Sequence, residues 1–202
     1  MVRAMGIPEE QGLYNPEFEK DNCGVGFIAN IKGIKSHDVV AKGIEILVKL
    51  SHRGAVGSDP LTGDGAGMLM QMPDEFFRSK VENLPKEGDY GVGVAFLPRK
   101  SDEQLIVEGI VERIVAEEGQ TVIGWRDVPH DEKSVGVTAG STLPVIRQVF
   151  IKRAADCANF ELKLYVIRRR IENEVAESDI KNKDYFYVPS MSSRTIVYKG
   201  LL

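Results

Sequence analysis

The residue with the clearest chemical potential is Cys23, which precedes Gly24-Val25-Gly26 and an apolar run. A cysteine attacks as the thiolate, so a catalytic cysteine needs a nearby base or a lowered pKa. The chain has three histidines, and none is close to Cys23 in the sequence. A cysteine at the start of a strand is also compatible with a purely structural role, as a small buried apolar side chain.

The α-amino group of Cys23 is one possible base. If the chain were cut between Asn22 and Cys23, this amine would lie on the same residue as the thiol. Its ordinary pKa is about 7.7–8.0, against about 8.5 for the thiol. It would therefore accept the thiol proton near neutral pH, directly or through one water. Gly24 and Gly26 would leave room for a substrate close to the backbone.

Arg53 is the second candidate, within His52-Arg53-Gly54 at the end of a predicted helix. The return of a strand–helix unit can bring it back beside Cys23. A fixed guanidinium there would orient the terminal residue or a substrate carboxylate. A solvated arginine near a helix C-terminus is the alternative.

The loop from Gly54 to Gly67 contains the third candidate group, Gly63-Asp64-Gly65. It is not a phosphate loop, because it lacks the Gly-Lys-Ser/Thr ending and precedes a strand instead of a helix. The Gly-Val-Gly-Val run after Tyr90 is equally weak as a dinucleotide fingerprint, since it lies inside a strand. The loop glycines are interpreted as a shaped loop near a small polar substrate, or as a tight connection. Cys157 is interpreted as structural.

The elements that must position these residues alternate irregularly between helix and strand. The segment 160–175 fits a strand or a helix, and its length without Gly or Pro favours a helix. A hairpin is predicted from 186–189 and 195–199, around Ser192-Ser193. Because strict βαβ alternation is absent, we expect an α+β or layered α/β fold. The other predicted elements are strands at 23–31, 68–72, 90–97, 121–125 and 146–151, and helices at 36–51, 74–82 and 102–118.

The composition narrows the function classes. The chain has 202 residues, 43% of them hydrophobic, and a net charge of −4. Its scattered basic residues indicate no nucleic-acid partner, and no apolar run approaches the roughly 20 residues of a membrane span. Residues 1–22 carry Pro8, Gly12 and Pro16, lack a signal-peptide core, and are predicted to form an extended leader. Cys23 and Cys157 do not make a disulfide framework, so we expect a cytoplasmic protein with reduced thiols.

Several stretches together resemble one family. CGVGFIANIKG, followed by LSHRGAVGSDPLTGDGAG, resembles the start of the glutaminase domain of the glutamate synthase large subunit. The later stretches GWRDVP, LPVIRQVFI, FELKLYVIRRRIE and YVPSMSSRTIVYKGLL are similar to the same family. These domains are class II amidotransferases, which are N-terminal-nucleophile hydrolases with a layered α/β/β/α fold.

The resemblance implies roles for single residues. Cys23 matches the nucleophile, which is unmasked when a propeptide is removed, so residues 1–22 are expected to be that propeptide and 23–202 the amidotransferase domain. Arg53 matches an arginine close to the nucleophile. Gly63, Asp64 and Gly65 match a family loop that supports the site.

The resemblance also implies a reaction and its partners. Glutamine would be hydrolysed to glutamate and ammonia, and the ammonia would be passed to a synthase region that makes glutamate from 2-oxoglutarate. No metal or cofactor is expected in this domain. FMN and an iron–sulfur cluster would belong to the central and FMN-binding synthase domains, in the same chain or a separate subunit.

The sequence departs from the family pattern at its C-terminal end. The oxyanion-hole Asn-Gly pair and a second substrate-binding arginine normally follow the stretch that matches SSRTIVYKG, which here is followed only by Leu201 and Leu202. The chain thus resembles the first half of the domain, and alone it is expected to lack glutaminase activity. The alternatives are a non-catalytic interaction module that keeps the fold, and a hydrolase of the same fold that acts on another amide.

Overall fold

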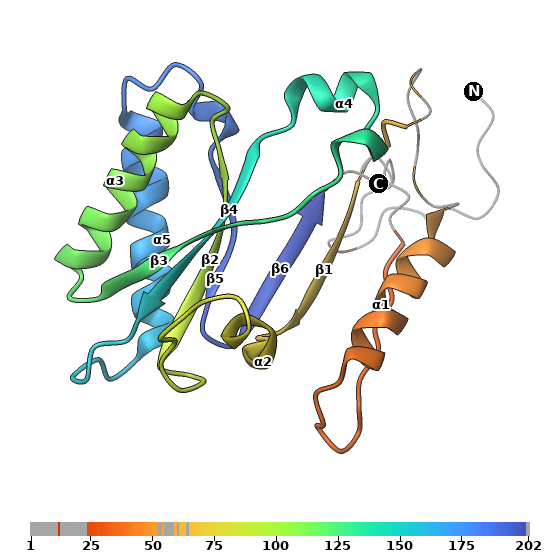
Figure 1. The fold of residues 1–202 in the computed structure, drawn as a ribbon, viewed down its shortest axis with the longest axis horizontal. Coiled ribbons are helices and arrows are strands. Elements are labelled where there is room, and N and C mark those ends of the chain that lie inside the picture. Colours follow the sequence, from red (N-terminus) through yellow and green to blue (C-terminus); the bar gives the residue numbers. More distant parts are fainter. Residues whose placement is uncertain are drawn as a thin grey trace. The chain divides into compact units, whose positions relative to one another are not determined.

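The computed structural model describes residues 12, 24–51, 54, 59, 61–63 and 65–200. The chain divides into two compact units, Met1–Val56 and Gly57–Leu202, and each unit is considered by itself. Figure 1 shows the helices and strands of both units. In the described part of the chain, no helix has the length and apolar character needed to cross a membrane.

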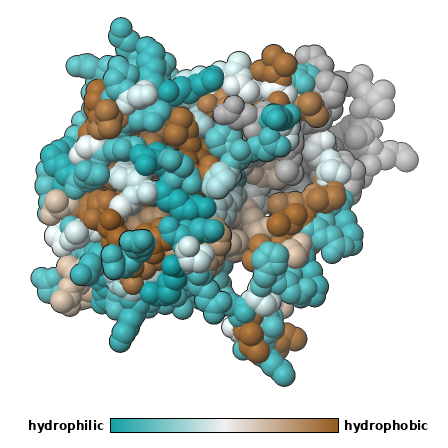
Figure 2. Space-filling view, in the orientation of Figure 1, coloured by the Kyte–Doolittle hydropathy of each residue, from teal (hydrophilic) through white to brown (hydrophobic). Residues whose placement is uncertain are grey.

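The first unit contains one helix, α1 (His37–Lys49), among its described residues. Ser36 lies at the N-cap in an extended conformation, but its side chain makes no capping hydrogen bond. Salt bridges of 2.6 Å join Asp38 to Lys42 and Glu45 to Lys49 along the helix surface. No residue of α1 is buried, and hydrophobic surface lies open along this segment in Figure 2.

The prediction of a strand at 23–31 is wrong for the residues that the structure describes. Gly24–Asn30 has no regular secondary structure, and a turn follows in which the Gly33 amide donates to the Asn30 carbonyl at 2.9 Å. Val25 is 89% exposed and Phe27 91% exposed. A strand needs a neighbour for its backbone hydrogen bonds, and the described residues of this unit provide no second strand. Apolar character alone therefore does not produce a strand here.

The second unit is built on two antiparallel sheets. The larger sheet has four strands in the order β3-β4-β2-β5, and the smaller sheet pairs β1 with β6. The predicted strands at 68–72, 90–97, 121–125 and 146–151 are confirmed, with shifted ends. The bounds are β1 Ala66–Gln71, β2 Tyr90–Leu97, β3 Thr121–Asp127, β4 Val145–Lys152, β5 Tyr187–Ser192 and β6 Thr195–Gly200.

The helices of this unit are α2 (Asp74–Arg78), α3 (Ser101–Glu117), α4 (Val137–Thr142) and α5 (Phe160–Glu177). The helix preferred for 160–175 is confirmed, because the residues spaced for a helical face are the buried ones. The Asn159 side chain caps it by accepting from the Leu162 amide at 3.1 Å. Helix α2 is shorter than predicted, and α4 was not predicted. The buried residues of α5 are Phe160, Leu164, Ile167, Ile171 and Val175.

Two hydrophobic cores arrange these elements in layers. One core lies between the four-stranded sheet and helices α3 and α5, which cover one face of that sheet in Figure 1. The other core lies on the opposite face, where Val92 and Phe150 pack with Ile196 of β6. The order is therefore helices, sheet, sheet, and the predicted α+β class is confirmed. The layers of residues 57–202 match the helix–sheet–sheet part of an α/β/β/α fold.

The glycines of β2 bring this strand close to its neighbours. A Cβ at Gly91 would lie 2.6 Å from Cδ1 of Leu164 on α5, and a Cβ at Gly93 would lie 2.8 Å from Cγ1 of Val149. Both distances are shorter than packed carbon atoms accept. Gly91 and Gly93 thus have a packing role on the helix-facing side of β2, which agrees with the rejection of a dinucleotide fingerprint.

The predicted hairpin around Ser192-Ser193 is wrong in its pairing. Strands β5 and β6 are consecutive, but β5 pairs with β2 and β6 pairs with β1. The Glu161 carboxylate on α5 binds the connection between these two strands. It accepts from the Ser192 hydroxyl at 2.9 Å and from the Ser193 amide at 2.7 Å, which holds the connection away from a hairpin turn.

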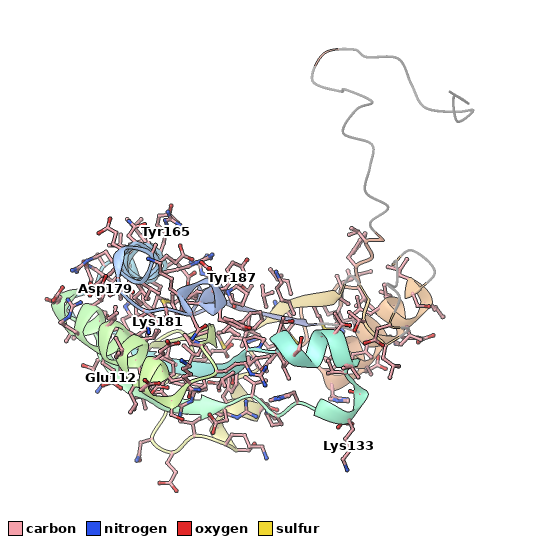
Figure 3. All side chains as sticks on the ribbon, turned by 90° about the horizontal axis from the view of Figure 1, so that it is seen from above. Glu112, Lys133, Tyr165, Asp179, Lys181 and Tyr187 are labelled. Carbon is pink, nitrogen blue, oxygen red and sulfur yellow. The ribbon has the colours of Figure 1, made fainter. Side chains whose placement is uncertain are left out.

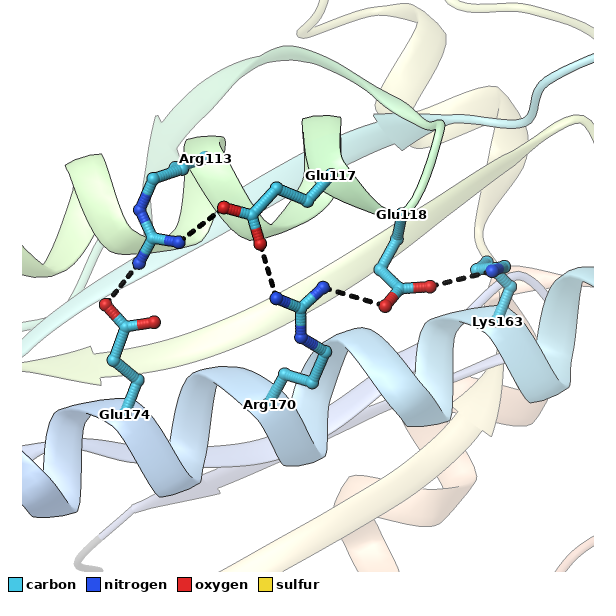
Figure 4. A network of polar contacts seen from close by, with 6 residues as sticks. All are labelled: Arg113, Glu117, Glu118, Lys163, Arg170 and Glu174. Carbon is cyan, nitrogen blue, oxygen red and sulfur yellow. Dashed lines mark hydrogen bonds and ion pairs between the residues drawn. The ribbon is translucent and has the colours of Figure 1, made fainter.

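An ionic network joins α3 to α5 on the outer face of the helix layer, and Figure 4 shows it from close by. Glu118 accepts from Lys163 at 2.7 Å and from Arg170 at 2.8 Å, and Arg170 also pairs with Glu117. Arg113 continues the network to Glu117 at 2.6 Å and to Glu174. Hydrogen bonds from Lys163, and then from Arg170, lower the pKa of Glu118. Glu118 thus bridges both helices.

We predict that Gly91→Ala destabilises the fold by about 1–3 kcal/mol, because the added methyl overpacks the buried Leu164. Gly109→Ala is the matched control, since Gly109 lies on exposed surface of α3 with no atom near its missing Cβ. That control should gain up to about 1 kcal/mol from helix propensity. Urea unfolding of both variants measures the difference, and a Gly91→Ala variant as stable as Gly109→Ala would contradict the packing argument.

We predict that the stabilisation by Glu118 depends on pH. The folded-state pKa of Glu118 is lowered from its ordinary value of 4.5, so its contribution is present above that value. The contribution is lost as pH falls through the lower, folded-state pKa. The loss of stability in Glu118→Gln should therefore be larger at pH 7 than at pH 3.

Urea unfolding across this pH range checks the expectation. The exposed Glu82, which lies outside the network, supplies the control variant Glu82→Gln, and its effect should stay within about 0.5 kcal/mol. An equal effect of Glu118→Gln at both pH values would argue against an ionic role for Glu118.

Candidate functional site

The predicted site residues divide between described and undescribed parts of the chain. Gly63 and Gly65 are described, whereas Cys23, Arg53 and Asp64 lie outside the described residues. The leader at 1–22 also lies outside them, apart from Gly12. The proximity of Arg53 to Cys23 therefore stays a prediction, and the described geometry concerns the segments around these residues.

The segment after Cys23 packs on helix α1. A Cβ at Gly26 would lie 2.5 Å from Cγ2 of Ile46, so only glycine fits at this contact. Ile46 cannot easily turn away, because a β-branched side chain in a helix has one strongly preferred rotamer. The sequence analysis explained Gly26 by room for a substrate, which stays a prediction, and the structure shows a packing role for this glycine. The contact joins the residues behind Cys23 to the helix that precedes Arg53.

The loop that carries Gly63 and Gly65 begins with a compact turn. The Asp59 carboxylate accepts from the Leu61 amide at 3.1 Å and from the Thr62 hydroxyl at 2.8 Å. The Asp59 carbonyl accepts from the Thr62 amide at 2.9 Å. An aspartate that bonds its own backbone two residues on is a recurrent way to fix a turn. This turn within the loop is therefore held by the side chains of Asp59 and Thr62.

This turn is bound to the first residues of α4, and we call the five residues concerned the Asp59 anchor. The Asp59 carboxylate accepts from the Thr138 amide at 3.1 Å, and the Thr62 hydroxyl accepts from the Ala139 amide at 3.3 Å. These bonds satisfy amides that a helix N-terminus leaves without intrahelical partners. The members are Asp59, Thr62, Gly136, Thr138 and Ala139.

The lowered pKa of Asp59 and the close packing at Gly136 are both consistent with the hydrogen bonds of the Asp59 anchor. Hydrogen bonds from the Thr138 amide, and then from Thr62 and the Leu61 amide, lower the pKa of Asp59. The carboxylate is therefore charged at neutral pH. A Cβ at Gly136 would lie 2.3 Å from Oδ2 of Asp59 and 2.5 Å from Oγ1 of Thr62, so position 136 accepts only glycine.

The loop ends where β1 begins. Gly65 has a φ of +91°, a conformation that side chains disfavour. A Cβ at Gly67 would lie 3.1 Å from the carbonyl oxygen of Tyr198 on the neighbouring strand β6. Because the run leads into a strand at Ala66, the rejection of a phosphate loop is confirmed. The backbone conformation explains the glycine at position 65, and close packing explains the glycine at position 67.

A buried polar chain lies between the two sheets, next to β1. Gln148 is completely buried, donates to the Tyr198 hydroxyl at 2.9 Å, and accepts from Arg126 at 2.8 Å. Tyr198 pairs with Met68, the third residue of β1. The Arg126–Gln148–Tyr198 chain thus fixes β6, and through it the strand into which the loop leads.

The sequence analysis missed both the Asp59 anchor and this chain. An Asp with a Thr three residues later is a local turn signal, and it was present at Asp59. A glutamine at an inward position of a strand was a second signal, at Gln148. The partners of both lie far along the sequence, and no local pattern points to them.

Cys157 packs against the core on the helix side of the large sheet, and it forms no disulfide. Its carbonyl accepts from Arg153 at 2.7 Å. These contacts fit the structural role that the sequence analysis gave to it.

Comparison with known proteins identifies the family. The family model described as class-II glutamine amidotransferases matches residues 23–202. The chain is 47% identical to the NADPH glutamate synthase large chain of Bacillus subtilis over 97% of its own length. It is 43% identical to the corresponding chain of Azospirillum brasilense over 93% of its length. Identity to the NADH glutamate synthase of Saccharomyces cerevisiae is 37%, over 97% of the chain.

The chain spans 13% of the length of each bacterial relative and 10% of the yeast one. The family match covers most of the chain and begins at Cys23. The layered antiparallel sheets of residues 57–202 agree with it. The chain belongs to the class-II glutamine amidotransferases.

Proposed function

We propose that the chain is the glutaminase part of a glutamate synthase, and that within the complete enzyme this part hydrolyses the side-chain amide of glutamine with Cys23 as nucleophile. The ammonia would pass to a synthase region that forms glutamate from 2-oxoglutarate. FMN and an iron–sulfur cluster would belong to that region. The relatives named as glutamate synthases support this partnership.

The observation that carries the proposal is that the family match starts at Cys23. A domain that begins with a cysteine has an amine and a thiol on one residue once the preceding segment is removed. Residues 1–22 would then be a propeptide, and its removal would create the base that the thiol needs. No histidine is required in this arrangement.

The thiol and the α-amine of Cys23 account for every proton and bond of the reaction. The α-amine takes the thiol proton, and the sulfur attacks the amide carbon of glutamine. The C–N bond breaks as the protonated amine returns the proton to the nitrogen, so ammonia leaves and a thioester forms. Water then attacks the thioester carbon, which releases glutamate and regenerates the thiol.

Arg53, Gly63, Asp64 and Gly65 would support this reaction. The packing of Gly26 on Ile46 favours a short path between Cys23 and Arg53, because it holds the two flanking segments together. A guanidinium near Cys23 would bind the α-carboxylate of glutamine or orient the new terminus.

We predict that Cys23→Ala reduces glutamine hydrolysis by the complete enzyme to below about a tenth of the wild-type rate, because it removes the covalent step. Ammonia release measures the effect, and the intact mass of the wild-type protein shows whether Cys23 has become its first residue. Cys157→Ala is the matched control and should leave the rate nearly unchanged. Substantial hydrolysis by Cys23→Ala would favour another nucleophile, and an inactive wild-type enzyme would favour a non-catalytic module.

We predict that Arg53→Ala lowers kcat/KM for glutamine by about 30- to 1,000-fold, which corresponds to a desolvated, charge-assisted contact of about 2–4 kcal/mol. Stability should change by less than about 1 kcal/mol if Arg53 serves the site and not the fold. Steady-state kinetics and urea unfolding of the same preparations test this. Comparable losses in both measurements would point to a structural arginine instead.

A further inference from the structure

We infer that a cavity at the junction of α3 and α5 is a binding site for a free α-amino acid with an apolar side chain. The cavity has a volume of about 430 Å³ and lies where α3 ends and α5 begins. Small-molecule sites in proteins have volumes of about 300–1,000 Å³. All of the lining residues belong to the second unit, so the site is independent of the proposed glutaminase chemistry.

Part of the cavity lining is apolar. Leu162 and Val166 lie one turn apart on α5, and Cys157 lines the cavity from the connection that precedes this helix. Leu162 is 57% exposed, so much of its apolar surface is in contact with water. An apolar ligand side chain that covers Leu162 removes this surface from water, which favours binding.

The same cavity is lined by charged side chains of both signs. The Lys163 ammonium donates to Glu118 at 2.7 Å, as Figure 4 shows, which leaves two of its three N–H groups for other acceptors. Glu118 also accepts from Arg170 at 2.8 Å, so both of its oxygens are already engaged. Among the described residues, the exposed Asp156 carboxylate has no hydrogen-bond or ion-pair partner. Asp156 is therefore the carboxylate that is open to a ligand cation.

The two helix ends reinforce this separation of charge. Helix α3 has 17 residues and ends at the cavity, and α5 has 18 residues and begins there. A helix carries partial negative charge at its C-terminus and partial positive charge at its N-terminus. The ammonium group of an amino acid thus matches Asp156 and the end of α3, and its carboxylate matches Lys163 and the start of α5. A ligand with one charge would satisfy only one of these two sides.

Binding of L-leucine to the complete enzyme tests the site, and isothermal titration calorimetry measures it. A dissociation constant of about 0.01–10 mM is expected for a ligand of this size. Isocaproate is L-leucine without its ammonium group, and isoamylamine is L-leucine without its carboxylate. Each should bind at least about 10-fold more weakly than L-leucine, because each loses one charge-assisted contact.

Three variants of the complete enzyme change the lining residues one at a time. Leu162→Asp, Asp156→Asn and Lys163→Met should each weaken the binding of L-leucine by at least about 10-fold. Leu162 and Asp156 have exposed side chains, so their variants should keep the fold even if Lys163→Met is destabilised through its ion pair with Glu118. Urea unfolding of each variant checks this.

The matched controls make the same changes at exposed positions away from the cavity. They are Leu105→Asp, Asp179→Asn and Lys181→Met. Figure 3 shows Asp179 and Lys181 near α5. Both residues follow the C-terminal end of that helix, whose length of about 25 Å separates them from the cavity. All three controls should bind L-leucine as the wild type does.

Each other outcome overturns the inference. It fails if L-leucine shows no saturable binding up to about 10 mM. Binding that survives Leu162→Asp and Asp156→Asn would place the ligand elsewhere in the enzyme. Equal binding of isoamylamine or of isocaproate would contradict a zwitterion site, and equal losses in the controls would indicate a general effect of the substitutions. Because the readout is binding, an enzyme that fails to hydrolyse glutamine would overturn the proposed function without affecting this test.

Discussion

The structure of residues 57–202 depends on the burial of β2 on both faces. Helices cover one side of this strand and the small sheet covers the other, so its side chains must alternate between two cores. Gly91 and Gly93 face the crowded side, where Leu164 and Val149 leave no space for a methyl group. Since β2 is hydrogen-bonded to β4 and β5, its position determines that of the whole large sheet.

The placement of the glycine-rich loop follows from this arrangement. The chain leaves the large sheet at Ser192, where Glu161 holds the connection, and enters the small sheet as β6. Strand β6 then sets the register of β1, and the Arg126–Gln148–Tyr198 chain fixes it against β4. The start of β1 at Ala66 is consequently held through the small sheet, and Thr62, earlier in the same loop, is held by the Asp59 anchor.

The sequence predicted correctly those elements whose buried face can be read from the spacing of their own residues. The spacing of apolar residues identified α5, because a helix shows its buried face in its own sequence. That β5 and β6 enter different sheets could not be predicted, because their pairing partners, β2 and β1, lie far away in the sequence. The prediction of a strand at 23–31 was wrong, because a strand needs a neighbouring strand for its backbone hydrogen bonds and its own residues do not specify that neighbour. In the candidate site, Cys23 and Arg53 could be proposed from their residue types alone. Asp59 could not, because its role depends on a hydrogen bond from Thr138, which is distant in the sequence.

Three glycines at which a side chain would collide differ in the atoms that surround them. Gly26, Gly91 and Gly136 all stand where a Cβ would collide, yet their neighbours are a helix side chain, a core side chain and a polar anchor. The first two contacts are apolar, so a methyl group there opposes packing. At Gly136 the neighbours are the oxygens of Asp59 and Thr62, so a methyl group would break hydrogen bonds to charged and polar groups that no core compensates. Of these three glycines, only Gly136 has polar side chains as its closest neighbours.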